Sequence, residues 1–394
     1  MLKEKTVVLG VTGSIAAYKI ANLARMLVKQ HCEVHVLMTQ NATNFINPIT
    51  FETLTKHKCL IDTFDRNFEF SVEHVALAKA ADVVMIAPAS ANVIGKIANG
   101  IADDMLTTTV MACPCKKIVS PAMNHNMFHN PIVQDNIEKL KHYGYEIVEP
   151  AHGMLANGDM GDGRMPDEEL LFEYIVKEIA FEKDMTGKKV LVTAGATVEA
   201  IDPVRFITNH SSGKMGFALA KNAMLRGADV TLVMGKCDSE PPVFVNTVKV
   251  QSAKDMYDAV IERADSMDII VKAAAVADYR PKNVSSEKVK KQDGNMSIEL
   301  ERTDDILKTL GERKNSQFIC GFSMETENML ENSRKKLEKK NCDMIVANNL
   351  KQDGAGFGGN TNIVTLITKD DEVQLEKMTK DEVAEKIFDF ILSR

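Results

Sequence analysis

The sequence lacks a disulfide framework, a signal segment and any long apolar run. Its seven cysteines are scattered and odd in number, which is typical of a chain in a reducing compartment. The charged segment Met1–Lys5 precedes the first apolar run, without the apolar core of a signal peptide. No apolar run approaches the roughly 20 residues that a membrane helix needs. We therefore expect a soluble, cytoplasmic protein that does not bind membranes.

An excess of positive charge is also lacking. The formal net charge is −7, which counts against nucleic-acid binding, although a local basic patch can still bind a phosphorylated metabolite. Cys113 and Cys115 are the closest pair of cysteines in the sequence. They have no further Cys or His partners at zinc-site spacing, so we do not expect a metal there.

Two common nucleotide-binding motifs are absent. The turn Gly10–Ala17 does not read G-x-G-x-x-G, which counts against a classical NAD site. The segment Ile207–Gly216 is not a P-loop, because Thr208 stands where glycine is required and Met215 replaces the Mg²⁺-binding Ser or Thr. Any nucleotide must therefore be bound by other turns.

The opening pattern of a nucleotide-binding fold, a buried strand followed by a glycine turn, nevertheless occurs twice in the chain. Thr6–Val11 reads as a buried strand that runs into a glycine turn, and Val190–Ala194 reads the same way. Free backbone N–H groups and the helix dipole at such a turn favour phosphate. The length of 394 residues also favours two cores. We predict two domains, residues 1–187 and 188–394.

Strands and helices alternate in both halves. Continuous apolar strands between helices indicate parallel sheets covered on both faces, so the fold class is α/β with two three-layer doubly wound domains. In the first half we predict strands at Thr6–Val11, Glu33–Met38, Asp82–Ala87, Lys117–Ser120 and Glu146–Val148, and helices at Ala16–Gln30 and Asp167–Lys183. In the second half we predict strands at Val190–Ala194, Asp229–Met234, Asp268–Ala274, Phe318–Phe322, Met344–Ala347 and Ile363–Ile367, and helices at Gly216–Arg226, Ala253–Ala264 and Lys380–Leu392.

Two segments break this alternation. Ala151–Pro166 is rich in Gly, Asp and Met without periodicity, and an irregular loop of that length is usually a lid or a binding loop. Ser285–Gly294 is polar and rich in lysine, which predicts a mobile excursion.

Small polar residues follow the strands of the first half. They lie in Gly10–Ala17, Ala87–Asn92 and Pro121–Met127, at the carboxyl edge of the predicted sheet, which is the usual ligand crevice. Ser, Thr and Asn in place of acids suit an uncharged ring and one phosphate. Over residues 5–180 this ordered set resembles the FMN-dependent cysteine decarboxylases, and among them the phosphopantothenoylcysteine decarboxylases of coenzyme A biosynthesis.

This resemblance implies a flavodoxin-like flavoprotein (HFCD) fold and assigns roles to individual residues. His74 would be the catalytic base, since an imidazole can accept a proton near neutral pH, although the residues alone also fit a histidine on the first turn of an amphipathic helix. Asn124 would hold the departing carboxylate, where the alternative is a strand-end turn. Met127 would contact the substrate. FMN would be bound by Gly13, Ser14, Ile15, Thr39, Ser90 and Asn92.

The lid departs from the family pattern. The family reads Ala-Cys-Gly, with the cysteine as the acid that reprotonates the enethiol intermediate, whereas this chain has Asn157. A carboxamide does not ionise usefully. Three explanations stay open: Asn157 was engineered to trap the intermediate, another donor such as Asp159, Asp162 or water replaces the cysteine, or the last half-reaction is impaired.

The second half contains a second cluster of functional motifs. Asn209–Gly216 combines amides, hydroxyls, glycines and a lysine before a helix, which predicts an anion cradle. Ala273–Tyr279 places Asp278 at the edge of the sheet, and Gly321–Thr326 and Lys336–Asn348 follow. Over residues 188–392 this series resembles the CTP-dependent bacterial phosphopantothenate–cysteine ligases, which have a Rossmann-like fold.

The second resemblance also implies roles by position. Arg205 and Asn209 would bind phosphopantothenate and its acyl-cytidylate, and Lys288 would neutralise charge during activation. CTP would be held by Ala274, Ala275, Asp278, Asp304, Asp305, Ile306, Leu307, Phe322, Lys336 and Lys340. The lysines of this region alone read as a solvated helix face. Mg²⁺ is implied because pyrophosphate is released, but the sequence does not identify its ligands.

Together the resemblances imply a bifunctional protein of coenzyme A biosynthesis. The ligase half would join 4′-phosphopantothenate to L-cysteine through an acyl-cytidylate, converting CTP to CMP and pyrophosphate. The decarboxylase half would then form 4′-phosphopantetheine using FMN. Trimeric decarboxylase contacts and dimeric ligase contacts would make a homo-oligomer, up to a dodecamer. Two alternatives stay open: a nicotinamide oxidoreductase with tandem doubly wound domains, and a flavin-binding protein with an impaired decarboxylase, which Asn157 favours.

Overall fold

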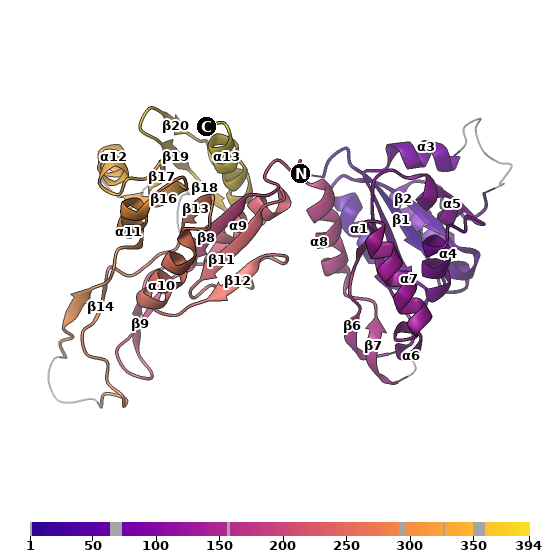
Figure 1. The fold of residues 1–394 in the computed structure, drawn as a ribbon, viewed down its shortest axis with the longest axis horizontal. Helices are drawn as coiled ribbons and strands as arrows, with labels where there is room; N and C mark the ends of the chain where they lie inside the picture. The colour runs from indigo at the N-terminus through magenta and orange to yellow at the C-terminus, as the bar shows by residue number, and fades with distance from the viewer. Residues whose placement is uncertain (1, 64–72, 156–157, 291–295, 326–327, 350–358) are drawn as a thin grey trace. The chain divides into compact units, whose positions relative to one another are not determined.

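The computed structural model describes residues 2–63, 73–155, 158–290, 296–325, 328–349 and 359–394. Contacts divide the chain into two compact units, Met1–Phe181 and Glu182–Arg394 (Figure 1). Each unit is built around its own parallel sheet, which confirms the predicted fold class. Within the described ranges no helix is long and apolar enough to cross a membrane.

The first unit contains a five-stranded sheet in the order β2-β1-β3-β4-β5, with every pairing parallel. All seven residues of β3 are buried, as expected for a central strand covered on both faces. The strands are β1 (Thr6–Val11), β2 (Glu33–Met38), β3 (Val83–Ala89), β4 (Lys116–Pro121) and β5 (Glu146–Ile147). The order places the turns after β1, β3 and β4 next to one another at the carboxyl edge.

Helices cover both faces of this sheet. On one face an apolar cluster joins α3 (Glu73–Ala80), α4 (Ala91–Ala98), α5 (Met105–Ala112) and α7 (Pro131–His142) to the strands. On the other face α1 (Ile20–Lys29) packs against α8 (Glu168–Ile179), which also contacts β3 and β4. Shorter elements are η1 (Ile15–Lys19), η2 (Gln40–Asn44), α2 (Pro48–Thr55) and α6 (His125–Phe128).

The lid segment is more regular than the sequence predicts. In place of an irregular loop, β6 (Ala151–Met154) and β7 (Met160–Arg164) form an antiparallel hairpin. Glycines at 153, 161 and 163 lower the apparent strand propensity of this segment, which explains why its sequence reads as a loop. Gly161 and Gly163 have no room for a side chain, because the backbone there lies against His125 and Met123, which follow β4.

The second unit contains an eight-stranded sheet in the order β12-β11-β8-β13-β16-β17-β19-β20. Pairings from β12 to β17 are parallel, and β19 and β20 continue the sheet antiparallel. The strands are β8 (Lys189–Ala194), β11 (Asp229–Met234), β12 (Asn246–Lys249), β13 (Ile269–Lys272), β16 (Phe318–Glu325), β17 (Met344–Asn349), β19 (Val364–Ile367) and β20 (Glu372–Gln374). The helices are α9 (Lys214–Leu225), α10 (Ala253–Ala264), α11 (Ile306–Arg313), α12 (Met329–Lys339) and α13 (Lys380–Leu392).

Helices again form two layers. The apolar cluster on one face draws on α10, α11 and α12, while α9 and α13 pack together against β8 and β11 on the other. Three small sheets add to this core, and Figure 1 shows β9 and β14 extending away from the large sheet. Their strands are β9 (Val198–Ala200) with β10 (Phe206–Thr208), β14 (Tyr279–Pro281) with β15 (Leu300–Arg302), and β18 (Thr361–Asn362) with β21 (Met378–Thr379).

The predicted mobile excursion is partly attached to the β9–β10 hairpin. Ser285 donates its backbone N–H to the carbonyl of Ile201 at 3.0 Å, and Val289 donates to Asp202 Oδ2 at 3.1 Å. Residues 291–294 of that prediction lie outside the described residues.

Candidate functional site

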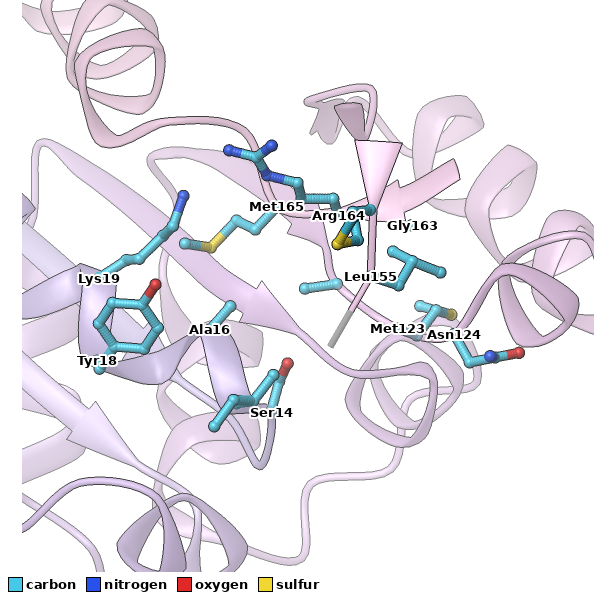
Figure 2. A pocket seen from close by; sticks show the side chains of 13 residues that line it. Ser14, Ala16, Tyr18, Lys19, Met123, Asn124, Leu155, Gly163, Arg164 and Met165 are labelled. Atoms are coloured by element: carbon cyan, nitrogen blue, oxygen red, sulfur yellow. The ribbon is translucent and has the colours of Figure 1, made fainter. Parts of the chain in front are cut away.

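The first unit has a cavity of about 470 Å³ where three segments meet (Figure 2). The turn after β1 and η1 form one wall, the turn after β4 forms another, and the lid hairpin closes the space between them. The lining residues are Ser14, Ile15, Ala16, Tyr18, Lys19, Ala122, Met123, Asn124, Met154, Leu155, Gly163, Arg164 and Met165. Ser14, Ile15 and Asn124 are thus brought together as the sequence predicts.

The turn after β1, where phosphate binding is predicted, is fixed by hydrogen bonds between neighbouring strand ends. Thr12 Oγ1 donates to the carbonyl of Pro88 at 2.7 Å and accepts from the backbone N–H of Ser90 at 2.9 Å. A side chain at Gly13 would begin 2.8 Å from Asn41 Cβ, so only glycine lets this turn pack against η2. Thr39 caps η2 by accepting from Ala42 N at 3.3 Å. The ends of β1, β2 and β3 are therefore held close together.

Ser90 and Asn92 stand at the start of α4. Ser90 is the N-cap residue but its hydroxyl forms no capping bond, so it is available to a ligand. Asn92 is exposed on the first turn. Gly13, Thr39, Ser90 and Asn92 share the carboxyl edge of the sheet with Ser14 and Ile15, although they do not line the cavity.

Asn124 is held between α6 and the lid. Its side-chain oxygen caps α6 by accepting from Asn126 N at 2.9 Å. The backbone N–H of neighbouring Met123 donates to the Gly163 carbonyl at 3.0 Å, and Gly163 has φ 122°. A Cβ on Gly163 would overlap the Met123 carbonyl oxygen. The lid backbone therefore rests directly on the Asn124 turn.

Gly163→Ala should lift the lid and lower decarboxylase activity, because both its φ and the adjacent carbonyl exclude a side chain. Gly144→Ala is a matched control, since Gly144 also has a positive φ, 84°, but opens onto free space. The control should lose only about 1 kcal/mol of unfolding free energy. Equal loss of activity in the two variants, measured beside thermal unfolding, would contradict the lid contact.

Three histidines surround Asp162 on the lid. Asp162 Oδ1 lies 2.9 Å from His152 Nδ1, and Oδ2 lies 2.9 Å from His129 Nε2. The backbone N–H of Asp162 also donates to His125 Nδ1 at 3.1 Å. Hydrogen bonds from His152 and His129 lower the pKa of the Asp162 carboxyl below its ordinary value. Asp162 therefore anchors the lid in its ionised form, which disfavours it as the acid that replaces the family cysteine.

His74 and Met127 do not line this cavity either. His74 is partly buried on the first turn of α3, which packs against α5. Met127 is 49% exposed on α6. Asn157 lies outside the described residues. On the flanks of that gap, the Leu155 N–H donates to the Asp159 carbonyl at 2.8 Å and the Gly158 N–H to the Leu155 carbonyl at 2.9 Å.

The second unit has two adjoining cavities, of about 270 and 390 Å³, at the carboxyl edge of its sheet. They share Lys272, Val276, Asp278 and Lys336. The first is also lined by Ser211–Gly216, which is most of the predicted anion cradle Asn209–Gly216. Every predicted CTP residue lines one or both cavities: Ala274, Ala275, Asp278, Asp304, Asp305, Ile306, Leu307, Phe322, Lys336 and Lys340.

Two lysines of the α12 region are held in place at this site. Lys336 Nζ donates to the Phe322 carbonyl at 2.8 Å, and Lys340 forms an ion pair with Asp305. Burial acts to raise the pKa of Asp305, but the hydrogen bond from Lys340 and that from Lys308 N outweigh it and lower the pKa. Asp305 is thus ionised at neutral pH and holds Lys340 over the cavity.

The predicted substrate residues lie on the β9–β10 side of the unit. Asn209 Nδ2 donates to the carbonyls of Ala275 and Val276, at 3.4 and 3.2 Å, and so touches the wall of the smaller cavity. Arg205 lines a separate cavity of about 630 Å³. Lys288 is exposed and lines none of these cavities.

Asp202 is a residue that sequence reasoning missed. Its buried carboxylate accepts from the backbone N–H groups of Val204 and Arg205, both at 2.8 Å, and from Val289 at 3.1 Å. Arg205 NH1 lies 3.7 Å from the same group. Asp202 thereby brings the segments of Arg205 and Lys288 together. The available signal was an acid inside a turn, directly before a proline and three residues before an arginine.

Comparison with known proteins agrees with this arrangement. The Flavoprotein family model matches residues 1–180, and the model described as DNA/pantothenate metabolism flavoprotein C-terminal domain matches residues 185–394. A Bacillus subtilis protein named Coenzyme A biosynthesis bifunctional protein CoaBC is 48% identical over 373 residues, covering 94% of this chain and 92% of the relative. A Vibrio cholerae protein of the same name is 42% identical, covering 99% and 98%. A solved C-terminal domain of such a protein is 48% identical, covers 53% of this chain and 96% of that one, and has a TM-score of 0.46.

The two domains define a flavoprotein joined to a pantothenate-metabolism domain. The chain belongs to the family of coenzyme A biosynthesis bifunctional proteins. It is a bifunctional enzyme with a decarboxylase and a ligase activity, which confirms the function predicted from the sequence. The nicotinamide alternative is set aside, because the first domain is a flavoprotein domain.

Proposed function

We propose that the second unit joins 4′-phosphopantothenate to L-cysteine at the expense of CTP, and that the first unit decarboxylates the product with FMN. The observation that carries the ligase half is the convergence of the predicted nucleotide residues on two adjoining cavities, although they come from segments between residues 274 and 340. The observation that carries the decarboxylase half is the cavity between the Ser14 turn, the Asn124 turn and the lid.

The first cavity and the turns beside it at the carboxyl edge fit FMN. Gly13 has no room for a side chain, the Ser90 hydroxyl is not used in capping, and the walls offer small and apolar side chains for a flat ring. Gly13, Ser14, Ile15, Thr39, Ser90 and Asn92 would hold the cofactor, with its phosphate at the glycine turn. When bound, FMN supplies reversible two-electron oxidation of the cysteine moiety, which makes loss of CO₂ possible.

The chain's own residues would position the substrate and move protons. Asn124, fixed by its cap on α6, would hold the departing carboxylate. His74 would act as the base and Met127 would contact the substrate. Because α3 does not line the cavity of its own unit, we propose that His74 and Met127 complete the site of a neighbouring subunit in a homotrimer. A dimer of ligase units would then build the proposed dodecamer.

In the ligase unit, the substrate carboxylate would attack CTP to form an acyl-cytidylate and release pyrophosphate. The cysteine amine would then displace CMP and form the amide. Asn209 and Arg205 would hold phosphopantothenate and the acyl-cytidylate, and Lys288 would neutralise charge during activation. Mg²⁺ would bind the phosphates, with Asp278 and Asp304 as candidate carboxylate ligands, since Asp305 is already paired with Lys340.

Asn157→Cys should raise the rate of 4′-phosphopantetheine formation at least tenfold, because a thiol can donate the final proton and a carboxamide cannot. CO₂ release in a single turnover should change little, since it precedes that step. Ligase activity is the internal control and should not change. An unchanged product rate would show that another donor has replaced the cysteine.

Two simple assays test the proposal as a whole. Purified protein should carry a yellow flavin, which is identified after heat release, and it should release pyrophosphate from CTP when phosphopantothenate is added. A colourless protein would overturn the decarboxylase half. A failure to consume CTP would overturn the ligase half.

A further inference from the structure

A lysine occupies an unusual place in the ligase unit. β13 lies between β8 and β16 in the middle of the large sheet, and Lys272 is its last residue, opposite Thr193 and Gly321. The three residues before it, Ile269–Val271, are buried. A lysine at the end of a central apolar strand has no packing role that an apolar residue would not fill better, and charged groups there are normally paired.

Lys272 lines both adjoining cavities, so its side chain lies at their junction. The other lysines around it are engaged: Lys336 with the Phe322 carbonyl, Lys214 with Asn360 at 2.9 Å, and Lys380 with the Gly359 carbonyl at 2.7 Å. Within the described parts of the chain, the Lys272 ammonium makes no hydrogen bond and no ion pair within 4 Å. It is therefore a positive charge that is available to an anion.

The surroundings of Lys272 carry an excess of positive charge. The lining of the smaller cavity includes one acidic residue, Asp278, and four lysines, at positions 214, 272, 336 and 380. The larger cavity is lined by four basic residues, Lys272, Lys336, Lys340 and Arg302, and by three acidic residues, Asp278, Asp304 and Asp305. Phosphate groups of a nucleotide would offset this excess, whereas a neutral ligand would leave it in place.

We propose that Lys272 is a further nucleotide-binding residue, which contacts the phosphates of CTP where the two cavities meet. The inference rests on the proposed ligase function and adds a residue to that same site. Its chemistry follows from the partial burial of Lys272, its unpaired ammonium and the neighbouring glycine- and serine-rich cradle.

The proposal has a consequence for pH. Burial, and then the charge of Lys336, lower the pKa of Lys272 to about 8, with Lys340 acting in the same direction and Asp305 and Asp278 opposing it. In the free enzyme Lys272 thus loses its charge as pH rises through about 8. A bound polyanion favours the charged form, so binding should draw a proton onto Lys272 and weaken above that pH.

Isothermal titration of the full-length protein with CTP and Mg²⁺, without phosphopantothenate, tests this at pH 7 and pH 9. Wild-type affinity should fall about tenfold between the two, the change expected for one group of this pKa. At pH 8, titrations in buffers of different ionisation enthalpy should show net proton uptake. Lys272→Arg should bind at both pH values without that fall, because arginine stays charged. Lys272→Met should bind about 10- to 100-fold more weakly at pH 7 and lose the pH dependence.

Lys386→Met is the matched control, since Lys386 is exposed on α13 and pairs with Asp389 at 3.6 Å. It should behave as wild type. CTP binding by the wild type with no loss in Lys272→Met, or the same pH dependence in Lys272→Arg, would overturn the role of Lys272 alone. No CTP binding by the wild type would overturn the ligase function together with this inference. Thermal unfolding of each variant separates loss of contact from loss of fold.

Discussion

Replacing His74 with asparagine should lower the decarboxylase rate by about 10²- to 10⁴-fold, the range expected for removing a general base. Asparagine keeps a similar shape and a hydrogen-bonding group but cannot accept the proton. The ligase rate should not change, because the chain forms two compact units with separate cores. Supplied with CTP, phosphopantothenate and cysteine, this variant should therefore accumulate phosphopantothenoylcysteine.

His142→Asn is the matched control in the same unit. His142 lies at the end of α7, is exposed and lines no part of the cavity. Its replacement should leave both rates unchanged. If the two variants keep the same decarboxylase rate, His74 is a helix residue without a catalytic role, and the proton acceptor must be sought elsewhere.

Replacing Lys336 with methionine should lower the ligase kcat/KM for CTP by about 10- to 150-fold. The charged contact that a lysine makes with phosphate is worth about 1.5–3 kcal/mol, and Lys336 lines both cavities in which we propose that CTP binds. The fall should appear mainly in the KM for CTP. Decarboxylation of supplied phosphopantothenoylcysteine should continue at the wild-type rate.

The neighbouring lysine offers a stringent control. Lys335 lies on the same helix, but its side chain is 69% exposed and pairs with Glu331 at 2.6 Å. Lys335→Met should leave the KM for CTP unchanged within about twofold, since exposed ion pairs contribute little. Similar losses in both variants would indicate a general effect of the basic helix surface rather than a contact to nucleotide.

The strands of both sheets were predictable because their signals are local. β1, β2 and β11 have the predicted bounds, and a continuous apolar run between helices needs no distant partner to be recognised. In the second unit the carboxyl end of β13 brings Ala274, Ala275 and Asp278 to the two adjoining cavities, as expected for a parallel sheet. The other predicted CTP residues followed from the family resemblance.

The rest depended on contacts between distant segments. The lid hairpin is set by Gly163 meeting Met123, forty residues away in sequence, and strand propensity does not report that contact. Asp202 accepts a hydrogen bond from Val289, which is distant in sequence. The role that we propose for Lys272 depends on the two cavities that it lines. A charged residue ending an apolar strand was nevertheless visible in the sequence at Lys272. The motif around His74 is local in sequence, whereas the neighbouring subunit that we propose it serves leaves no signal in the sequence.

The central claim is that one chain performs two successive reactions, and cysteine labelled with ¹³C in its carboxyl group tests it most directly. Incubation with CTP, 4′-phosphopantothenate and the purified protein should give ¹³CO₂ and unlabelled 4′-phosphopantetheine, both dependent on CTP, with at least one CMP formed for each CO₂. Label retained in phosphopantothenoylcysteine would contradict the decarboxylase half of the account. Release of ¹³CO₂ without CTP, directly from free cysteine, would contradict the order of the two reactions.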